Sequence, residues 1–491
     1  MSHAETSPAN ALAANTAVQL VGKVVSITIG VIVVGLMTRL LGTEGFGKYS
    51  TANTFLQVFA ILMDLGLNVM LVQMLGEQAG NEKEERRIVS AFFTMRVLMA
   101  SVVLTVGTAL AWLIPTYDLE IKLAIVGLWI SFFFTLLNQT VIGVQQRHLK
   151  MHVVAMAEVA GRATLLAGML IAITRGWGLL PVVLIVSLGG VVSFLINIGV
   201  AIRYASFRWN VDVPLWKIAL KRSWPIAISI MFSLIYFRAD LLILGWVRPQ
   251  AEVGVYGAAY RVLEILVSLP YMYGGVLLPM IARQWKDGAR DKFRMFIQRS
   301  FDAMALVTFP LLFGTFAIAT PAMTLVAGAE FGQSGDILRI LILATGAIFI
   351  ATVFSHAVVA LDAQRDMLPW YIWTAIFAVI GYAILIPRYG MWAAAWLTVA
   401  TEIAVLVGNI IVVIRRAELP LNISVASKAF IASIALFAVA WALEPYSLFA
   451  AIVGSTLVYV ALTFAMKALT PEIVRELMRT RKGVPEKETV L

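Results

Sequence analysis

Long runs of apolar residues recur along the whole chain, and short polar or charged stretches separate them. Each run is near the roughly 20 residues that a helix needs to cross a bilayer. The runs are continuous rather than alternating, which disfavours membrane-spanning strands. The pattern therefore predicts an all-α polytopic membrane protein with about fourteen transmembrane helices. Their approximate limits are residues 18–41, 50–75, 88–114, 121–145, 153–174, 179–202, 223–247, 253–281, 297–319, 336–361, 368–387, 391–414, 424–443 and 447–467.

The charged residues between these spans predict their orientation. Loops after even-numbered spans, together with the span ends that adjoin them, carry twenty Lys and Arg residues, whereas those after odd-numbered spans carry six. Because an excess of Lys and Arg marks cytoplasmic loops, both termini are expected in the cytoplasm. No outer loop is long enough to hold a soluble domain. The first sixteen residues carry no Lys or Arg, so they are not expected to act as a secretory signal.

A short internal repeat predicts the arrangement of the spans. The pattern Gly-x-Tyr-x-x-Ala occurs at 47–52 and again at 254–259, six spans later. Because six is an even number, both copies would have the same orientation, as in parallel repeats related by an axis along the membrane normal. We therefore expect two six-helix lobes, related by a parallel pseudo-two-fold, around a central cavity, plus two C-terminal helices. The expected parts are a cytoplasmic N-terminal tail (1–17), an N-lobe (18–203), a cytoplasmic inter-lobe linker (204–222), a C-lobe (223–416), spans thirteen and fourteen (417–468) and a basic cytoplasmic tail (469–491) that lies on anionic lipid.

Composition narrows the class of protein. Of the 491 residues, 60% are hydrophobic and only 13% are charged, which is about half the charged share of a soluble domain. This balance excludes a soluble enzyme and a nucleic-acid binder with a basic surface. Cysteine is absent, so disulfides, thiolate metal sites and a cysteine nucleophile are excluded as well. His148 and His152 have a metal-like i, i+4 spacing, but no carboxylate lies nearby in their basic loop, so no metal is expected.

One segment imitates a nucleotide-binding motif. Residues 42–49 nearly spell a phosphate-binding loop, but Tyr49 stands where the motif needs a Ser or Thr to hold magnesium. The segment also falls on the predicted outer face, where there is no ATP. We therefore expect no nucleotide and no bound cofactor, and transport would depend on H⁺ or Na⁺ coupling or on the membrane potential.

Charged residues inside the predicted spans need a specific reason to be there. An Arg at the bilayer centre costs ~2.5–3.5 kcal/mol on insertion scales. These groups are therefore expected to face protein or a water-filled cavity. The basic ones are Lys23, Arg96, Arg162, Arg238, Arg261 and Arg339, and the acidic ones include Asp64, Glu158, Asp240, Glu264, Asp302 and Glu402.

Two of these charges favour a polyanionic ligand. Arg238 and Arg261 lie on adjacent antiparallel spans, and two guanidiniums that converge in a cavity present forks of donors that suit phosphate. Arg261 also has Glu264 on its own helix face at i, i+3. Asp64 is expected either to balance cavity charge, to carry a coupling proton or to cap a helix.

Glu158 and Arg162 have the i, i+4 spacing that places both on one helix face. A structural ion pair explains this spacing as well as a functional role does. Arg238 and Asp240 are two residues apart and so diverge on a helix. For Arg96 on the third span, a role in helix packing is the better explanation.

Five segments carry a family resemblance: Thr38–Ser50, Asp64–Leu67, Arg238–Gly245, Val253–Arg261 and Leu385–Gly390. Together they resemble the bacterial polysaccharide-transport flippases (Wzx-like) of the multidrug/oligosaccharidyl-lipid/polysaccharide exporter superfamily. The resemblance extends from about residue 18 to residue 415. Trp392 departs from it, since the family often has Gly there.

This resemblance implies a cationic central cavity and alternating access. The implied substrate is an undecaprenyl-diphosphate-linked oligosaccharide, moved from the cytoplasmic to the outer leaflet of the bacterial inner membrane for exopolysaccharide, capsule or O-antigen synthesis. Membrane lipid, a polysaccharide polymerase and the chain-length machinery are further expected partners. The candidate substrate-binding cations are Arg238, Arg261, Arg162 and Arg39, and the candidate coupling or charge-balancing acids are Asp64, Asp240, Glu264 and Glu158.

Three other functions agree less well with the sequence. A cation-coupled multidrug antiporter of the same superfamily would need an acidic cavity, whereas basic residues inside the spans are at least as evident as acidic ones. A membrane polysaccharide polymerase or ligase usually needs a large outer loop with catalytic Arg or His, which this chain lacks, so we predict that it is not an enzyme. A non-transporting scaffold would leave the charges inside the membrane without a reason.

Overall fold

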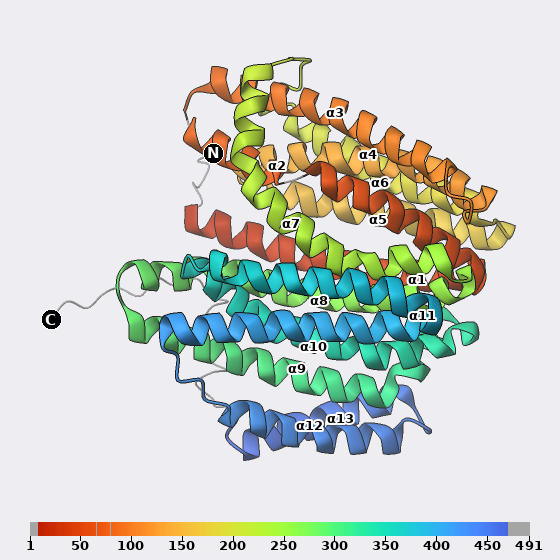
Figure 1. The fold of residues 1–491 in the computed structure, drawn as a ribbon, viewed down its shortest axis with the longest axis vertical. Helices are drawn as coiled ribbons and strands as arrows, with labels where there is room; N and C mark the ends of the chain where they lie inside the picture. Colours follow the sequence, from red (N-terminus) through yellow and green to blue (C-terminus); the bar gives the residue numbers. More distant parts are fainter. Residues whose placement is uncertain (1–7, 65, 79, 470–491) are drawn as a thin grey trace, which may run out of the picture. The chain divides into compact units, whose positions relative to one another are not determined.

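The computed structural model describes residues 8–64, 66–78 and 80–469, with side chains outside the description at 8–20 and 225–237. Every regular element in this part of the chain is helical (Figure 1). The helices are α1 (Pro8–Asp64), α2 (Leu67–Glu77), α3 (Glu82–Trp112), α4 (Leu119–Arg147), α5 (Met151–Arg175), α6 (Leu179–Ala201), α7 (Val213–Val247), α8 (Gln250–Lys286), α9 (Arg290–Ala327), the 3₁₀ turn η1 (Ala329–Phe331), α10 (Gly332–Ala360), α11 (Gln364–Ala417), α12 (Ser424–Leu443) and α13 (Leu448–Ala465).

The predicted fold class is confirmed. Eleven helices in the described part of the chain are long and apolar enough to cross a membrane. Two of them, α1 and α11, each join two predicted spans across one non-helical glycine, Gly42 (φ 64°) and Gly390 (φ 59°). Glycine takes a positive φ readily, so the chain changes direction at these points without a loop. The count of fourteen spans and the symmetry of two lobes stay predictions.

Two helices begin ten residues before the membrane spans predicted within them. Helix α1 begins at Pro8 rather than at residue 18, because the intervening stretch is rich in Ala, the strongest helix former. Helix α7 begins at Val213, inside the predicted linker, because Asp212 accepts a hydrogen bond from the backbone N–H of Leu215 at 3.1 Å and caps the helix. Arg87 donates to the same carboxylate at 2.7 Å and lowers the pKa of Asp212.

The second predicted span is interrupted at Gly66, whose φ of 75° ends the helical path before α2. The predicted tails fall mainly beyond the structure: residues 1–7 and 470–491 lie outside the described part of the chain.

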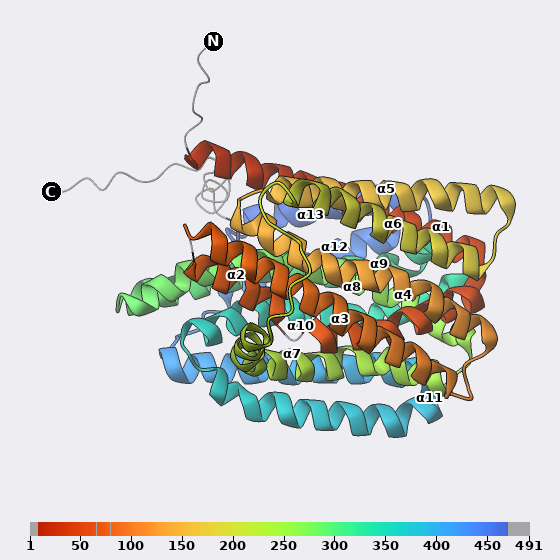
Figure 2. The ribbon, with the colours of Figure 1, turned by 90° about the horizontal axis from the view of Figure 1, so that it is seen from above.

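The chain divides into two compact units. Unit 1 comprises Met1–Ala258, Val326–Phe331 and Ala375–Ala394, and unit 2 comprises Ala259–Leu325, Gly332–Thr374 and Ala395–Leu491. In unit 1, α4 packs against α3 and α6, while α5 packs against α1 and α6 (Figures 1 and 2). In unit 2, α12 pairs with α13. The apolar core of unit 2 includes the fully buried side chains of Ile281, Phe293, Ile297, Phe354 and Val413.

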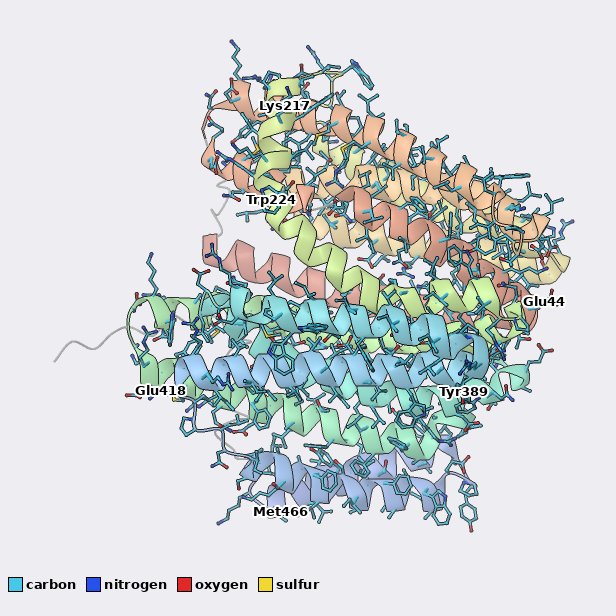
Figure 3. All side chains as sticks on the ribbon, viewed as in Figure 1. Glu44, Lys217, Trp224, Tyr389, Glu418 and Met466 are labelled. Carbon is cyan, nitrogen blue, oxygen red and sulfur yellow. The ribbon has the colours of Figure 1, made fainter. Side chains whose placement is uncertain are left out.

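The ends of unit 1 follow the order expected of a membrane-crossing chain. Glu44, just after the first predicted span, and Tyr389, at the end of the eleventh, lie at one end of this unit (Figure 3). Lys217, which follows the sixth predicted span, lies at the other end. The two residues that follow odd-numbered spans therefore lie at one end, and the residue that follows an even-numbered span lies at the other. A chain that crosses a membrane repeatedly requires this alternation.

Gly47 of α1 and Gly254 of α8 lie against each other inside unit 1. A Cβ atom on Gly47 would be 1.7 Å from the carbonyl oxygen of Gln250, and one on Gly254 would be 1.9 Å from the carbonyl oxygen of Thr43. The contact is reciprocal, because each glycine meets the residue four positions before the other. These glycines begin the two copies of the sequence repeat, so the copies meet backbone to backbone.

A buried ion pair joins α1 to α3. Arg96 is fully buried, and its Nη1 lies 2.8 Å from Oδ1 of Asp64. The same nitrogen donates to the carbonyl of Leu136 on α4 at 3.2 Å. Arg96 of α3 therefore contacts both α1 and α4. Asp64, a predicted coupling acid, forms an ion pair.

We expect Gly47→Ala to destabilise the protein. Overpacking a well-packed site costs ~1–3 kcal/mol, and here the added methyl group meets backbone that cannot rotate away. The thermal unfolding midpoint in detergent should fall. Gly199→Ala in α6 is the matched control, because a Cβ there meets nothing within 4 Å. Equal midpoints for the two variants would contradict the close approach.

We expect Asp64→Asn to destabilise the protein by ~3–5 kcal/mol, because it leaves the guanidinium of Arg96 buried without a counter-charge. The double variant Asp64→Asn/Arg96→Met should regain much of that loss, since it removes both charges. Thermal unfolding of the three proteins in detergent measures the effect. A single variant as stable as the unmodified chain would show that the pair is not needed.

Candidate functional site

A line of polar side chains runs along the face between α1 and α5 in unit 1. The Oε1 atom of Glu158 lies 3.3 Å from Nζ of Lys23 and accepts a hydrogen bond from Oγ of Ser26 at 2.7 Å. Both donors are on α1, whereas Glu158 is on α5. Glu158 therefore pairs across the helices with Lys23, and the ion pair with Arg162 that the helical spacing suggested is absent from the described part of the chain.

Arg162 lies one turn further along α5 and extends over Gly30 of α1. Its Nη1 is 3.1 Å from the point where a Cβ on Gly30 would be, so the missing side chain makes room for the guanidinium. The Arg162 side chain is exposed, and no described residue forms an ion pair with it. Residue 162 is near the middle of α5, and so at membrane depth. The described residues of unit 1 thus leave the charge of this guanidinium without a counter-charge.

Asp240 ties α7 to α8. It is fully buried, and its carboxylate accepts hydrogen bonds from the hydroxyl of Tyr256 at 2.5 Å and from the backbone N–H of Leu241 at 2.7 Å. Arg238, two residues earlier on α7, is half-buried. The two side chains therefore differ in exposure, which agrees with their divergence on the helix.

Arg39 lies near one end of unit 1, beside the bend of α1. Its side chain is exposed, and its Cγ is 3.4 Å from the point where a Cβ on Gly328 would be. At the same end, the labelled Glu44 projects from α1 just beyond Gly42 (Figure 3).

The segment that imitates a phosphate-binding loop is helical from Thr43 onwards. The Nζ of Lys48 lies 2.6 Å from Glu120, 2.9 Å from Asp118 and 3.3 Å from Glu44. Three carboxylates therefore surround the lysine that a nucleotide-binding loop would use for phosphate. Lys48 holds the start of α4 against α1, a role that the sequence did not reveal.

In unit 2, Arg261 and Glu264 form the predicted i, i+3 pair on α8, with Nη1 and Oε2 2.7 Å apart. Arg339 on α10 pairs with Asp336 in the same way and donates to the carbonyl of Phe316 at 3.1 Å. Arg238 belongs to unit 1 and Arg261 to unit 2, so their convergence in one cavity stays a prediction.

Glu402 is an acid inside the membrane to which the sequence analysis gave no role. It lies on the second half of α11, and only 4% of its surface is exposed. Among the described residues, no side chain forms an ion pair or a hydrogen bond with it. Its only signal in the sequence was a carboxylate near the centre of an apolar run.

Each unit contains a cavity of its own. In unit 2 a cavity of about 380 Å³ is lined by the apolar residues Phe309, Leu312, Phe313, Phe316, Leu343, Phe430 and Phe437. In unit 1 a cavity of about 220 Å³ has polar walls that include Glu82, Glu85, Arg86, His148, Arg203 and Tyr204. The ring of His148 lies tilted beside that of Tyr204, with 5.2 Å between their centroids. No cluster of metal-ligating side chains occurs among the described residues.

Two solved structures resemble this fold over most of their length. The lipid II flippase MurJ in its inward closed conformation has a TM-score of 0.76 and 14% sequence identity, covering 95% of this chain and 99% of MurJ. An inward-facing multidrug resistance MATE family transporter of the MOP superfamily has a TM-score of 0.64 and 15% identity, covering 82% of this chain and 97% of the transporter. At such identities the likeness establishes the fold.

Sequence comparison identifies the family. A protein of Shigella dysenteriae described as a candidate O-antigen transporter is 20% identical over 380 residues, covering 76% of this chain and 93% of that protein. These relatives are described as transporters and flippases, which agrees with the prediction that this chain is not an enzyme. Residues 12–285, more than half of the chain, match the family described as polysaccharide biosynthesis protein. The chain therefore belongs to the polysaccharide biosynthesis protein family and is a multi-pass membrane transporter.

Proposed function

We propose that this protein is a flippase for undecaprenyl-diphosphate-linked oligosaccharides. It moves them from the cytoplasmic to the outer leaflet of the bacterial inner membrane, and both of its termini lie in the cytoplasm. Membership of the polysaccharide biosynthesis family and the similarity to a candidate O-antigen transporter support a glycan substrate. The fold shared with the lipid II flippase MurJ supports a lipid-linked one.

The observation that carries this proposal is the exposed guanidinium of Arg162. An Arg in the middle of a span costs ~2.5–3.5 kcal/mol if it faces lipid, and no carboxylate of the described chain offsets that cost. It is therefore expected to face a hydrated cavity or an anionic ligand. A diphosphate fits this requirement, because a guanidinium donates two parallel hydrogen bonds to phosphate oxygens.

The acids of the predicted site strengthen the preference for an anion. Lys23 already pairs with Glu158, and Arg96 already pairs with Asp64. These carboxylates do not cancel the charge of Arg162. In our proposal Arg162, Arg238 and Arg39 of unit 1 hold the diphosphate and the first sugars as the protein alternates between inward and outward access, while the prenyl tail stays in lipid.

A multidrug antiporter has the same fold but a different electrostatic requirement. A cationic drug needs an accessible, unpaired carboxylate. In unit 1 the candidate acids Asp64 and Glu158 are paired with cations. In unit 2 Glu402 has no ion pair among the described residues, but it is only 4% exposed. The arrangement therefore favours an anionic substrate.

We expect Arg162→Ala to lower translocation by about 10- to 100-fold, because a hydrogen bond to a charged group is worth about 1.5–3 kcal/mol. Arg162→Lys should retain part of the activity, since it keeps the charge but loses the bidentate geometry. The measurement is the fraction of lipid-linked repeat units that reach the outer leaflet in a deletion strain complemented by each variant.

Arg175→Ala is the matched control, because Arg175 is an exposed arginine in the last turn of the same helix. This variant should translocate the substrate normally. Protein levels must be equal in all strains. Normal translocation by Arg162→Ala would remove the observation on which the proposal depends. If the deletion strain itself accumulated no lipid-linked repeat units in the cytoplasmic leaflet, the proposed substrate would be wrong.

A further inference from the structure

Glu402 lies at the centre of the second half of α11, where the chain is at membrane depth. It is 4% exposed, and the neighbouring Thr398 and Thr401 are at most 1% exposed. Among the described residues it has no cation and no hydrogen-bond donor within bonding distance. A carboxylate without a partner in a residue so little exposed is rare, because burying an unpaired charge costs so much that the group neutralises instead.

The other candidate acids do not share this situation. Asp64 and Glu264 each lie within 2.8 Å of a guanidinium nitrogen, and Glu158 lies 3.3 Å from the ammonium of Lys23. Asp240 accepts two hydrogen bonds. A nearby cation or hydrogen-bond donor compensates a carboxylate for the loss of water, and each of these four acids has such a partner. Glu402 is suited to exist as the neutral acid.

The neighbours of Glu402 connect it to the protein surface. Tyr271 of α8 and Tyr371 of α11 lie within electrostatic range of its carboxyl group. Tyr271 is 58% exposed, whereas Glu402 is buried. A phenol hydroxyl can both donate and accept a hydrogen bond, so Tyr271 stands where a proton could pass between Glu402 and the outside of unit 2.

The same part of α8 also faces a histidine. Gly274, three residues after Tyr271, packs against the ring of His356 on α10, whose Cε1 is 2.2 Å from the point where a Cβ on Gly274 would be. Nδ1 of His356 donates to the carbonyl of Thr352 at 2.7 Å. Among the described residues, Tyr271 and Tyr371 are the titratable groups within electrostatic range of Glu402, and His356 faces the adjacent turn of α8.

We propose that Glu402 is a proton-binding site that couples transport to the proton gradient. The acid is neutral in the conformation described here. When the cycle hydrates this part of unit 2, the O–H bond of the carboxyl group breaks and the proton passes to water near Tyr271. Rebinding of a proton from the opposite side of the membrane restores the dry state. The coupling rests on the proposed transport function, whereas the proton-binding site itself does not.

The first experiment detects the proton directly in the full-length purified protein. Infrared spectroscopy separates the C=O stretch of a protonated carboxyl group from that of a carboxylate. We expect the protonated band to lose one component in Glu402→Gln and to keep it in Glu264→Gln, whose native residue pairs with Arg261. A band that is unchanged in Glu402→Gln would overturn the proposal. If Glu402→Gln does not fold, Glu402→Asp should shift the pH at which the band disappears, and an unshifted band would overturn it equally.

The second experiment measures coupling in proteoliposomes that contain lipid-linked oligosaccharide. An imposed gradient of about one pH unit should change the rate of the unmodified protein by up to about tenfold, the factor that corresponds to one pH unit. Glu402→Gln should give one rate whatever the direction of the gradient. Glu418→Gln, a surface carboxylate of unit 2 that is 86% exposed, should behave as the unmodified protein does. A Glu402→Gln variant that still responds to the gradient would overturn the coupling role.

The two experiments separate this inference from the proposed function. Loss of the infrared component together with an unmodified protein that moves no lipid-linked oligosaccharide would support the proton site and overturn the proposed substrate. In the opposite case, the unmodified protein moves the lipid-linked oligosaccharide, but Glu402→Gln leaves the infrared band unchanged. That result would support the flippase and overturn the proton site.

Discussion

The low polarity of the membrane interior governs where this chain keeps its charges. At bilayer depth a charged side chain must be paired, protonated or hydrated, because the hydrocarbon cannot solvate it. Arg162 and Glu402 have no counter-charge among the described residues. Arg162 is exposed, whereas Glu402 is buried. That difference is why we assign the first to an anionic substrate and the second to a proton. Other charges satisfy the constraint by pairing: Asp64 with Arg96, Lys23 with Glu158, and Arg261 with Glu264.

The same absence of water constrains the backbone. Each peptide group must find its hydrogen bond within the protein, so the described elements are helices. In α1 and α11, two helical segments are joined by a single non-helical glycine. Helices in a membrane associate by close packing rather than by a hydrophobic force. The contact between Gly47 and Gly254 is of this kind, and only the absence of a side chain at both positions permits it.

The residues that were predicted well are those whose partners are local. The pairing of Arg261 with Glu264 follows from their spacing on one helix, and the structure contains it. The partner of Glu158 could not be predicted, because Lys23 is 135 residues away in the sequence and reaches it only through the packing of α1 against α5. Helical spacing suggested Arg162 instead.

The sequence by itself determined the membrane class, the helical elements, their approximate limits and the family. Apolar runs, basic loops and short motifs are properties of consecutive residues, and a bilayer acts on each run independently. Only the tertiary structure decided which charges are neutralised. The partner of a charge and its access to water depend on the neighbouring helices. In the sequence Glu402 is one of several acids within apolar runs, and only the structure shows that it is buried without a partner among the described residues.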